Sequence, residues 1–307
     1  MQMAEDRKLK GIESGPSVVP ANSLKSSLKV EPVSPALGAE VSNVAIANAV
    51  ADDDLFAEIR GLLIKYRVLF FRDQDISPAV HVDFARRFGP LETHPVLPSH
   101  PDHPELLLLN RDTKHSYENT WHSDATWRAF PPFGSVLRCV ACPEVGGDTM
   151  WVNMVLAYER LPRHIQQRIA NLRAKHSIEH SFGGSMSPAG RAKLSEANPT
   201  VEHPVVRTHP ETGEKVLFVN QGFTTHFVNF HNDEEVRYGQ DFTIEANNLM
   251  NYLVRQAEIP EYQVRLRWKP NTIAIWDNRA TQHYAIHDYY PAVRKMMRAT
   301  IVGDQPY

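Results

Sequence analysis

Hydrophobic and polar positions alternate over short stretches of the chain, and this spacing predicts strands more often than helices. Residues 28–33 alternate in character, and residues 68–71 form an apolar run that predicts a buried strand. Between them, the acidic run at 52–54 supplies N-cap residues for a helix whose apolar side chains recur at helical spacing. The first part of the folded chain is therefore predicted to run strand, helix, strand.

Strands also dominate the elements predicted after residue 72, and no βαβ alternation is visible. This pattern favours an α+β, mainly β class, with a β-barrel or double-sheet core and flanking helices. Residues 176–200 are polar and irregular, and they predict a long loop. The predicted helices lie at 78–88, 154–172 and 245–256, and the predicted strands at 106–109, 134–141, 149–152, 204–208, 216–220, 263–268 and 272–276.

The pattern also predicts where the folded part begins. Residues 1–27 are polar and contain Gly15-Pro16, Pro20 and a Ser/Lys cluster, which is typical of a disordered or loosely attached tail. Residues 28–307 are predicted to form a single domain, which is long enough to bury a full core without disulfides.

Composition narrows the functional classes. The chain has 307 residues, 42% hydrophobic and 22% charged, and a formal net charge of -3, so no basic face for nucleic acid is implied. No apolar stretch approaches the roughly 18–20 residues of a membrane span. The cysteines, Cys139 and Cys142, are interpreted as core thiols of a reducing compartment, and the cytoplasm is the expected location. The assembly state stays open, with a homo-oligomer as one possibility.

The first candidate metal ligands lie in the stretch Trp121-His122-Ser123-Asp124. In a strand end or turn, residues two apart project to the same side, so His122 and Asp124 can converge on one ion. Two ligands do not make a metal site. Taken by itself, this motif is better explained by a surface loop with a capping aspartate.

A third candidate ligand, His283, ends the stretch from Trp276, where an apolar strand is predicted to run into a polar turn. Two histidines and one carboxylate on one face of an octahedron leave three positions open, which suits Fe(II), a chelating 2-oxo acid and O₂. The same ligands can hold zinc for hydrolysis, which needs only one open position. Iron and zinc both remain open at this point.

Two arginines follow this histidine on a predicted strand. Arg294 and Arg298 share parity, so their side chains should point the same way, beside His283. A guanidinium binds a carboxylate through two parallel hydrogen bonds, as the distal carboxylate of 2-oxoglutarate requires. Spacing alone favours two exposed arginines at a strand end over a carboxylate-binding pair.

Taken together, the motifs resemble the taurine dioxygenase family. The resemblance lies in WDNRATQHYAIHDYYPAVRKMMRATIVGDQP at 276–306, WHSDATW at 121–127, GGDTMWVN at 146–153, HPVVRTHPETG at 203–213 and FVNQGFTT at 218–225. These blocks occur in the family's order and cover nearly the whole chain from residue 28. The resemblance implies a double-stranded β-helix (jelly-roll) core. It also implies Fe(II), 2-oxoglutarate and O₂, with hydroxylation of a substrate and release of succinate and CO₂.

The resemblance also assigns roles to residues of this chain. His122, Asp124 and His283 match the family's iron ligands. Thr149 and Arg294 match the groups that hold the distal carboxylate of 2-oxoglutarate. The remaining matches concern the primary substrate: Arg298 and His94 for its sulfonate or sulfate, and Trp127 and Phe182 for the aromatic pocket wall.

Two departures weaken the case for taurine itself. Leu97 stands where taurine-specific members have tyrosine, and Glu118 stands near their asparagine. An apolar Leu97 suits a longer organic tail, as in alkylsulfatases, whereas Glu118 would repel an anion if it points inward. The segment 231–247 also looks longer than in close members and is expected to reshape the pocket mouth.

The sequence therefore predicts an iron- and 2-oxoglutarate-dependent dioxygenase for a small anionic substrate. An alkyl sulfonate or alkyl sulfate ester is the leading interpretation, with release of sulfite or sulfate and an aldehyde. One alternative is the same chemistry on an aryloxyalkanoate or a biosynthetic intermediate. The other, from a different class, is a zinc hydrolase or a non-catalytic metal-binding β-barrel.

Overall fold

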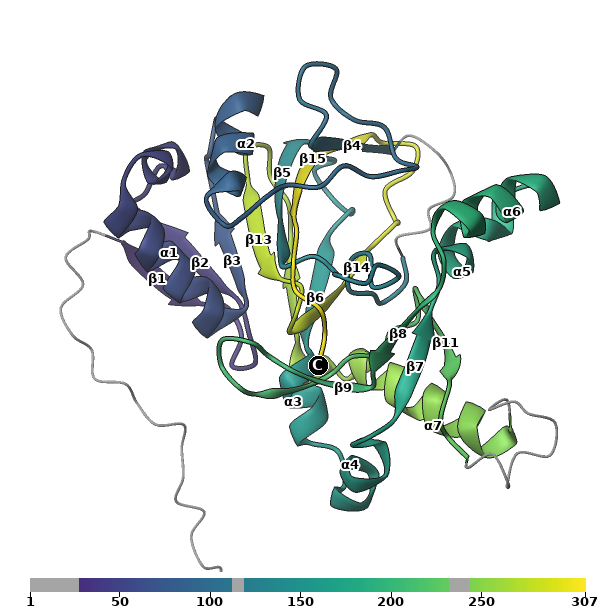
Figure 1. Cartoon of the computed structure of the whole chain (residues 1–307). Coiled ribbons are helices and arrows are strands. Elements are labelled where there is room, and N and C mark those ends of the chain that lie inside the picture. Colours follow the sequence, from purple (N-terminus) through teal and green to yellow (C-terminus); the bar gives the residue numbers. More distant parts are fainter. Residues whose placement is uncertain (1–27, 112–118, 232–242) are drawn as a thin grey trace, which may run out of the picture.

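The largest sheet of the protein has seven strands and brings together segments from both ends of the chain (Figure 1). The computed structural model describes residues 28–111, 119–231 and 243–307. In sheet order, the strands are β1 (Lys29–Pro32), β2 (Ala39–Ser42), β3 (Val68–Phe71), β13 (Ile273–Asp277), β5 (Gly134–Ala141), β15 (Arg294–Ile301) and β4 (Leu106–Arg111).

A smaller sheet faces the inner side of the large one. It consists of β12 (Gln263–Leu266), β6 (Thr149–Asn153) and β14 (Thr281–Ala285), in that order. Side chains from both sheets meet in one apolar cluster, which includes Phe70 and Trp276 from the large sheet and Trp151 from the small one. The predicted strand-dominated α+β core is thus confirmed.

Trp151 is one of three tryptophans in the apolar cluster between the two sheets. It is fully buried, and its ring centroid lies 5.5 Å from that of Phe70 and 5.8 Å from that of Trp276. Trp151→Ala should lower the free energy of unfolding by about 3–5 kcal/mol, because neighbouring rings cannot refill the space. Urea unfolding measures this loss. The exposed aromatic Phe130 serves as control, and a Phe130→Ala variant that loses as much stability would contradict the assignment.

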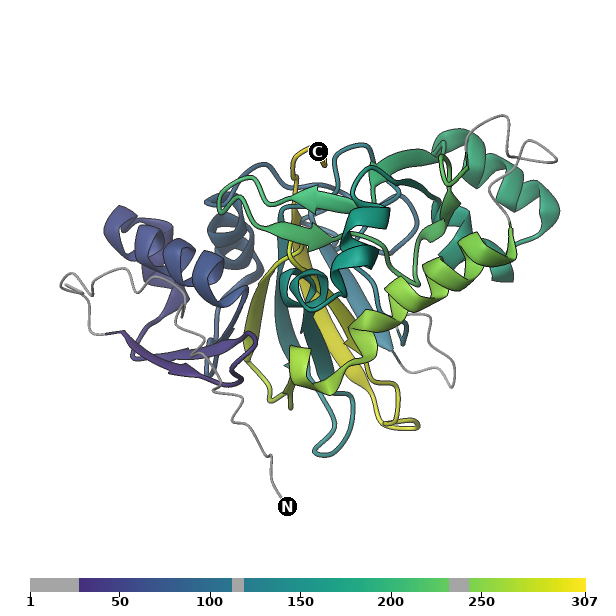
Figure 2. The same cartoon turned by 90° about the horizontal axis from the view of Figure 1, so that it is seen from below.

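Two helices cover the outer face of the large sheet (Figures 1 and 2). Helix α1 (Asp53–Tyr66) begins after Asp52, whose side chain accepts a hydrogen bond from the backbone N–H of Leu55. Helix α2 (Pro78–Arg86) has proline in its first turn, where the missing N–H costs nothing. Both predicted helices are confirmed, and their apolar faces form one core with the outward-facing side chains of the sheet.

Most of the other elements surround the far side and one end of the small sheet (Figure 2), whereas the 3-10 turn at Ile46–Val50 packs with α1 and α2. Strands β11, β7 and β8 form a third sheet, and β9 and β10 form a hairpin. Their bounds are β7 (Arg173–His176), β8 (Val201–Pro204), β9 (Val206–Thr208), β10 (Lys215–Leu217) and β11 (Thr224–Phe227). The helices are α3 (Met154–Glu159), α4 (Arg163–Ile169), α5 (Ile178–Phe182), α6 (Pro188–Ala197) and α7 (Ile244–Val254), with 3-10 turns at Ile46–Val50, Gly183–Ser185, Arg255–Glu258 and Pro260–Tyr262.

Two predictions about helices were wrong. The single helix predicted over 154–172 is broken into α3 and α4, because Pro162 cannot donate a backbone hydrogen bond and its ring clashes with the preceding turn. The loop predicted over 176–200 instead contains α5 and α6. Helix α6 begins after Ser187, whose hydroxyl accepts a hydrogen bond from the backbone N–H of Gly190. Its sequence shows no apolar face, because only Leu194 is buried, and the helix was therefore not predicted.

Several strands were missed or misplaced. β2, β7 and β11 were not predicted, and the strand predicted over 204–208 is divided between β8 and β9. The polar turn predicted to end at His283 covers only residues 278–280, and His283 itself lies on strand β14. Thr281, Gln282 and His283 are polar yet buried, a combination that hydrophobic patterning cannot detect.

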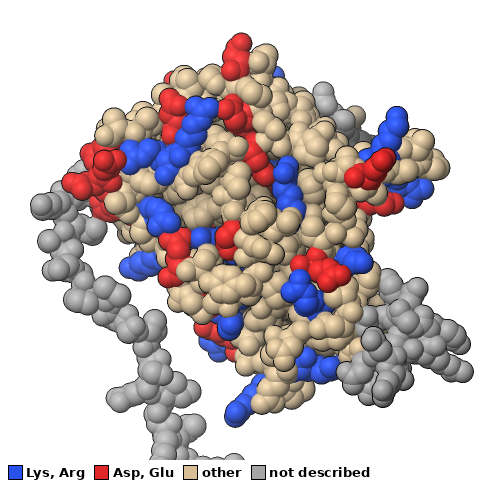
Figure 3. All heavy atoms as spheres, viewed as in Figure 1, with Lys and Arg blue, Asp and Glu red and all other residues tan. Residues whose placement is uncertain are grey.

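Among the described residues, no helix is long and apolar enough to cross a membrane. Acidic and basic side chains are interspersed on the face shown in Figure 3. Cys139 is buried in the core, and Cys142 is half-buried and free. The predicted tail, residues 1–27, lies outside the described residues.

Candidate active site

The two predicted histidine ligands are brought together by the backbone. His122 and His283 form an isolated antiparallel bridge. The N–H of His122 donates to the carbonyl of His283 at 3.1 Å, and the N–H of His283 donates back at 2.8 Å. Directly opposed residues in such a pair point to the same face, so the two imidazole centroids lie 4.2 Å apart.

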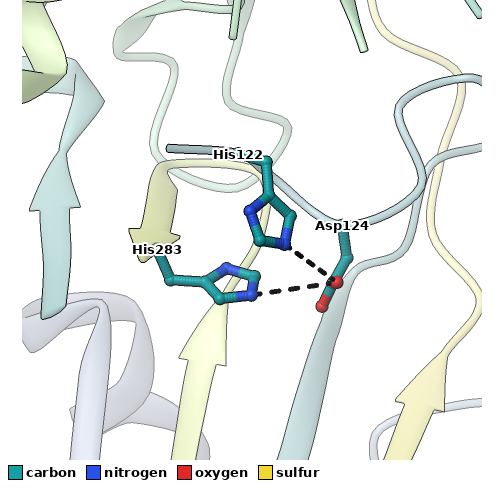
Figure 4. A group of neighbouring side chains, drawn as sticks. All are labelled: His122, Asp124 and His283. Atoms are coloured by element: carbon teal, nitrogen blue, oxygen red, sulfur yellow. Dashed lines mark ion pairs between the residues drawn. The ribbon is translucent and has the colours of Figure 1, made fainter. Parts of the chain in front are cut away.

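Asp124 completes the cluster (Figure 4). The Nε2 atoms of His122 and His283 each lie 3.9 Å from Oδ1 of Asp124, and one potential ligand atom from each residue lies within 4.8 Å of the others. The 3.9 Å separations are short enough for one ion with bonds of about 2.1 Å to contact a histidine and the carboxylate together. The donor set of two imidazoles and one carboxylate therefore fits a divalent transition metal.

The protonation states also suit metal binding. Nδ1 of His122 donates to the carbonyl of Thr120 at 2.7 Å, which leaves the Nε2 lone pair facing Asp124. Burial, together with His122, holds the pKa of His283 well below its usual value, so its ring is neutral. Burial alone would raise the pKa of Asp124, but Arg298 and the two histidines outweigh it and hold that pKa at about 2.

The loop that carries Asp124 is held by one buried amide. Oδ1 of Asn278 accepts from the backbone N–H of Asp124 at 2.7 Å, and Nδ2 of Asn278 donates to the carbonyl of Asp124 at 3.1 Å. Nδ2 also donates to the carbonyl of Pro132. The Asp124 carboxylate receives a further hydrogen bond from the Ser135 hydroxyl at 3.2 Å. Asn278 directly follows β13, so the core sheet positions the loop.

Thr149 and Arg294, which the family resemblance assigns to 2-oxoglutarate, lie together. Nη2 of Arg294 donates to Oγ1 of Thr149 at 3.1 Å, and Nε1 of Trp268 donates to the same oxygen at 2.9 Å. The expected position of Arg294 beside His283 was wrong in detail. β15 belongs to the large sheet and β14 to the small one, so the two side chains face each other across the space between the sheets.

Arg298 and His94 line the same cavity as His122, Asp124 and His283. Nη1 of Arg298 donates to Oδ1 of Asp124 at 2.7 Å. Nδ1 of His94 accepts from the backbone N–H groups of Val96 and Leu97, each at 3.1 Å. Since Nδ1 is the acceptor, the ring proton resides on Nε2. Burial, with Arg298 and Arg128, lowers the pKa of His94 to about 4, which keeps the ring neutral.

One cavity of about 280 Å³ joins all nine predicted site residues. Trp127 and Phe182 line it, as predicted, and so does Leu97. Further apolar lining comes from Val96, Leu109, Leu137, Met186 and Phe223. Glu118 lies outside the described residues, as does most of the segment 231–247.

The sequence interpretation missed several residues of this site. Glu92 lines the cavity two positions before His94, so the alternation of an extended segment was an available signal. Asn278 stands inside the quoted WDNR motif, but no spacing rule connects it to Asp124. Trp268 lies two residues after the end of β12, and only the fold brings it to Thr149.

Comparisons with known proteins agree with this geometry. The family model of the taurine catabolism dioxygenase TauD, TfdA family matches residues 29–300. An alkylsulfatase from Acinetobacter baylyi is 34% identical over 276 residues, which cover 87% of this chain and 83% of the relative. An alpha-ketoglutarate-dependent sulfate ester dioxygenase from Pseudomonas putida is 33% identical, with 91% of each chain covered. The crystal structure of a taurine dioxygenase from Burkholderia xenovorans has a TM-score of 0.75 at 34% identity, covering 92% of this chain and 93% of the other.

Proposed function

The chain belongs to the taurine catabolism dioxygenase TauD, TfdA family, and on that premise we propose that it oxidises an alkyl sulfate ester or alkyl sulfonate at the carbon that bears the sulfur group. It is a 2-oxoglutarate-dependent dioxygenase, as its relatives are. Family membership therefore sets aside the zinc hydrolase and the non-catalytic binding protein. The substrate and the residue roles below are the proposal.

One observation supports the substrate class: both hydrogen-bond donors and apolar side chains line the cavity. Arg298 and the Nε2–H of His94 offer hydrogen bonds to an anionic head next to the metal cluster. Leu97, Phe182 and Met186 offer apolar contacts to an organic tail. A substrate with a sulfate or sulfonate head and an alkyl chain complements both the donors and the apolar side chains.

We assign the metal to His122, Asp124 and His283, and we propose Fe(II) rather than zinc. Bound together, Fe(II), 2-oxoglutarate and O₂ supply the oxidant that hydroxylates an unactivated carbon, with release of succinate and CO₂. Arg294 and Thr149 hold the distal carboxylate of 2-oxoglutarate, with Trp268 fixing the threonine hydroxyl.

The residues of this chain then determine which carbon reacts. Arg298 and His94 fix the head group, so the carbon attached to it faces the metal cluster. The apolar walls exclude water from that carbon. Once hydroxylated, it carries both a hydroxyl and a sulfate or sulfonate; the hydroxyl proton leaves, the bond to the sulfur group breaks, and an aldehyde with sulfate or sulfite is released.

The proposal also includes the type of β-core, the domain bounds and the cellular location. We infer that the large sheet and the β12-β6-β14 sheet together form the double-stranded β-helix of the family, supported by their facing arrangement and shared core. We also infer a single domain over 28–307, supported by a family match that spans 29–300. A cytoplasmic location remains the proposal drawn from two unpaired cysteines.

A substrate panel tests the proposed function. At saturating 2-oxoglutarate, hexyl sulfate and hexanesulfonate should stimulate succinate formation, with sulfate or sulfite released in equal amount. An aryloxyacetate and hexanol complete the panel. Stimulation by the aryloxyacetate alone would overturn the sulfur-substrate proposal in favour of the same chemistry on an aryloxyalkanoate.

Asn278 gives a prediction about the metal site. Asn278→Ala should weaken metal binding about 10–100-fold, because the backbone of Asp124 loses both hydrogen bonds that orient it. Binding of Mn(II), measured by its electron paramagnetic resonance signal, reports this without turnover. Asn153→Ala is a matched control: it also removes a buried amide with three hydrogen bonds, at the start of α3. Equal weakening in both variants would mean that Asn278 acts only through stability.

A further inference from the structure

Glu92 brings a carboxylate into the cavity wall beside the groups assigned to the anionic head. Its backbone N–H donates to the carbonyl of Thr300 at 3.0 Å, and Leu91 pairs with Ile301. The segment therefore runs along β15, two residues beyond Arg298. The Glu92 side chain is only 12% exposed, and both it and Arg298 line the cavity.

Arg128 is the partner of this carboxylate. Its Nε lies 3.2 Å from Oε2 of Glu92, and its Nη2 donates to the carbonyl of Thr93 at 3.2 Å. Its guanidinium also lies over the ring of Trp127, 4.7 Å from the centroid. Glu92 and Arg128 thus form a fixed pair of opposite charges at the wall of the proposed head-group site.

The charges around this site can be counted once the proposed ligands are included. No net charge remains on the metal and 2-oxoglutarate site. The divalent ion and Arg294 are positive, and they balance the negative charges of Asp124 and the two carboxylates of 2-oxoglutarate. Among the described residues near the head group, Arg298 and Arg128 then contribute two positive charges and Glu92 contributes one negative charge. His94 is neutral. One positive charge remains for the substrate to balance.

We propose that Glu92 restricts the head group to a single negative charge, so that the cavity accepts sulfate esters and sulfonates and rejects dianionic phosphate esters. A second negative charge on the head would face the Glu92 carboxylate in a poorly hydrated cavity, where like charges repel strongly. The proposal rests on the function proposed above and names the residue that separates two tetrahedral oxyanions of similar shape.

The protonation state of Glu92 determines the pH at which the proposal is tested. Burial raises its pKa to about 7, while Arg128 and Arg298 oppose that rise and Asp124 adds to it. At pH 8 the carboxylate form therefore predominates. An alkyl phosphate is then a dianion, because its second pKa is about 6, whereas an alkyl sulfate remains a monoanion.

The experiment compares hexyl sulfate with hexyl phosphate at pH 8. Isothermal titration of the anaerobic enzyme, loaded with Fe(II) and 2-oxoglutarate, gives a dissociation constant for each ligand without turnover. Glu92→Gln keeps the shape of the side chain and removes its charge. It should shift the sulfate-to-phosphate affinity ratio toward phosphate by on the order of tenfold or more.

Two further variants sharpen the result. Glu40→Gln neutralises a comparable pair outside the cavity, in which Oε2 of Glu40 lies 3.3 Å from Nε of Arg72, and it should leave the ratio unchanged. The double variant Glu92→Gln/Arg128→Gln restores the original net charge and should return the ratio toward that of the wild type. Thermal unfolding of each variant confirms that it is folded.

The experiment distinguishes a failure of the proposed function from a failure of the role proposed for Glu92. If the wild-type protein does not bind hexyl sulfate, the proposed function fails, and this inference falls with it. If hexyl sulfate binds and Glu92→Gln leaves the ratio unchanged, only the role of Glu92 is overturned. A ratio shift that the double variant does not reverse would likewise contradict a purely electrostatic role.

Discussion

His283→Ala should abolish succinate formation with every substrate, a loss of at least about 1,000-fold, because two remaining ligands cannot hold the ion in place. His283 has no nearby substitute: the described histidines and acids yield a single three-residue cluster of potential ligands, and it contains His122, Asp124 and His283. Its Nε2 lies 3.9 Å from the carboxylate oxygen that both rings face. Metal content after dialysis against Fe(II) or Mn(II) measures the loss directly.

His287→Ala is the matched control for this variant. His287 follows four residues later, and its ring contacts Tyr289 outside the cavity lining. It should keep both metal and activity. A His283→Ala protein that still binds one ion per chain would move the metal site away from the cluster and contradict the assignment.

Arg298→Met should remove sulfate-dependent succinate formation while the slow, substrate-independent consumption of 2-oxoglutarate persists. Losing a buried, hydrogen-bonded cation opposite an anionic head costs about 2–5 kcal/mol of binding free energy. Arg298→Lys keeps the positive charge but not the planar guanidinium, and it should lose less binding free energy than Arg298→Met. Succinate assayed with and without hexyl sulfate separates the coupled from the uncoupled reaction.

Arg298 also bonds Asp124, so the metal site must be checked in the same variant. Mn(II) affinity close to that of the wild type would show that the loss concerns the substrate. Lys295→Met controls for removing a positive charge from the same strand, because Lys295 is exposed and does not line the cavity. Unchanged hexyl sulfate turnover in Arg298→Met would contradict the head-group assignment.

The sequence predicted the chemically important residues better than the strands that carry them. His122 and Asp124 follow from the side-chain geometry of residues two apart, His283 from the polar turn predicted after an apolar strand, and Arg294 from its parity with Arg298. The motif resemblance added Thr149 and assigned a role to each. All of these line one cavity. However, His283 was expected on a turn and lies on β14, because a strand of buried polar side chains has no hydrophobic pattern.

What could not be predicted depends on contacts between distant segments. Asn278 reaches the backbone of Asp124 across 154 residues of sequence, and Trp268 reaches Thr149 across 119. Glu92 carries a local signal, its parity with His94, but only the fold shows that it pairs with Arg128 beside Arg298. Helices α5 and α6 were mistaken for a loop because few of their side chains are buried.

The most direct test of the central claim is an anaerobic titration followed by visible absorption. Adding Fe(II) and 2-oxoglutarate to the wild-type protein should produce a weak charge-transfer band at one iron per chain, and hexyl sulfate should then shift that band. The shift would report an alkyl sulfate bound beside the metal held by His122, Asp124 and His283. The absence of any band would contradict the iron and 2-oxoglutarate assignment, and a band that no alkyl sulfate or sulfonate perturbs would contradict the proposed substrate site.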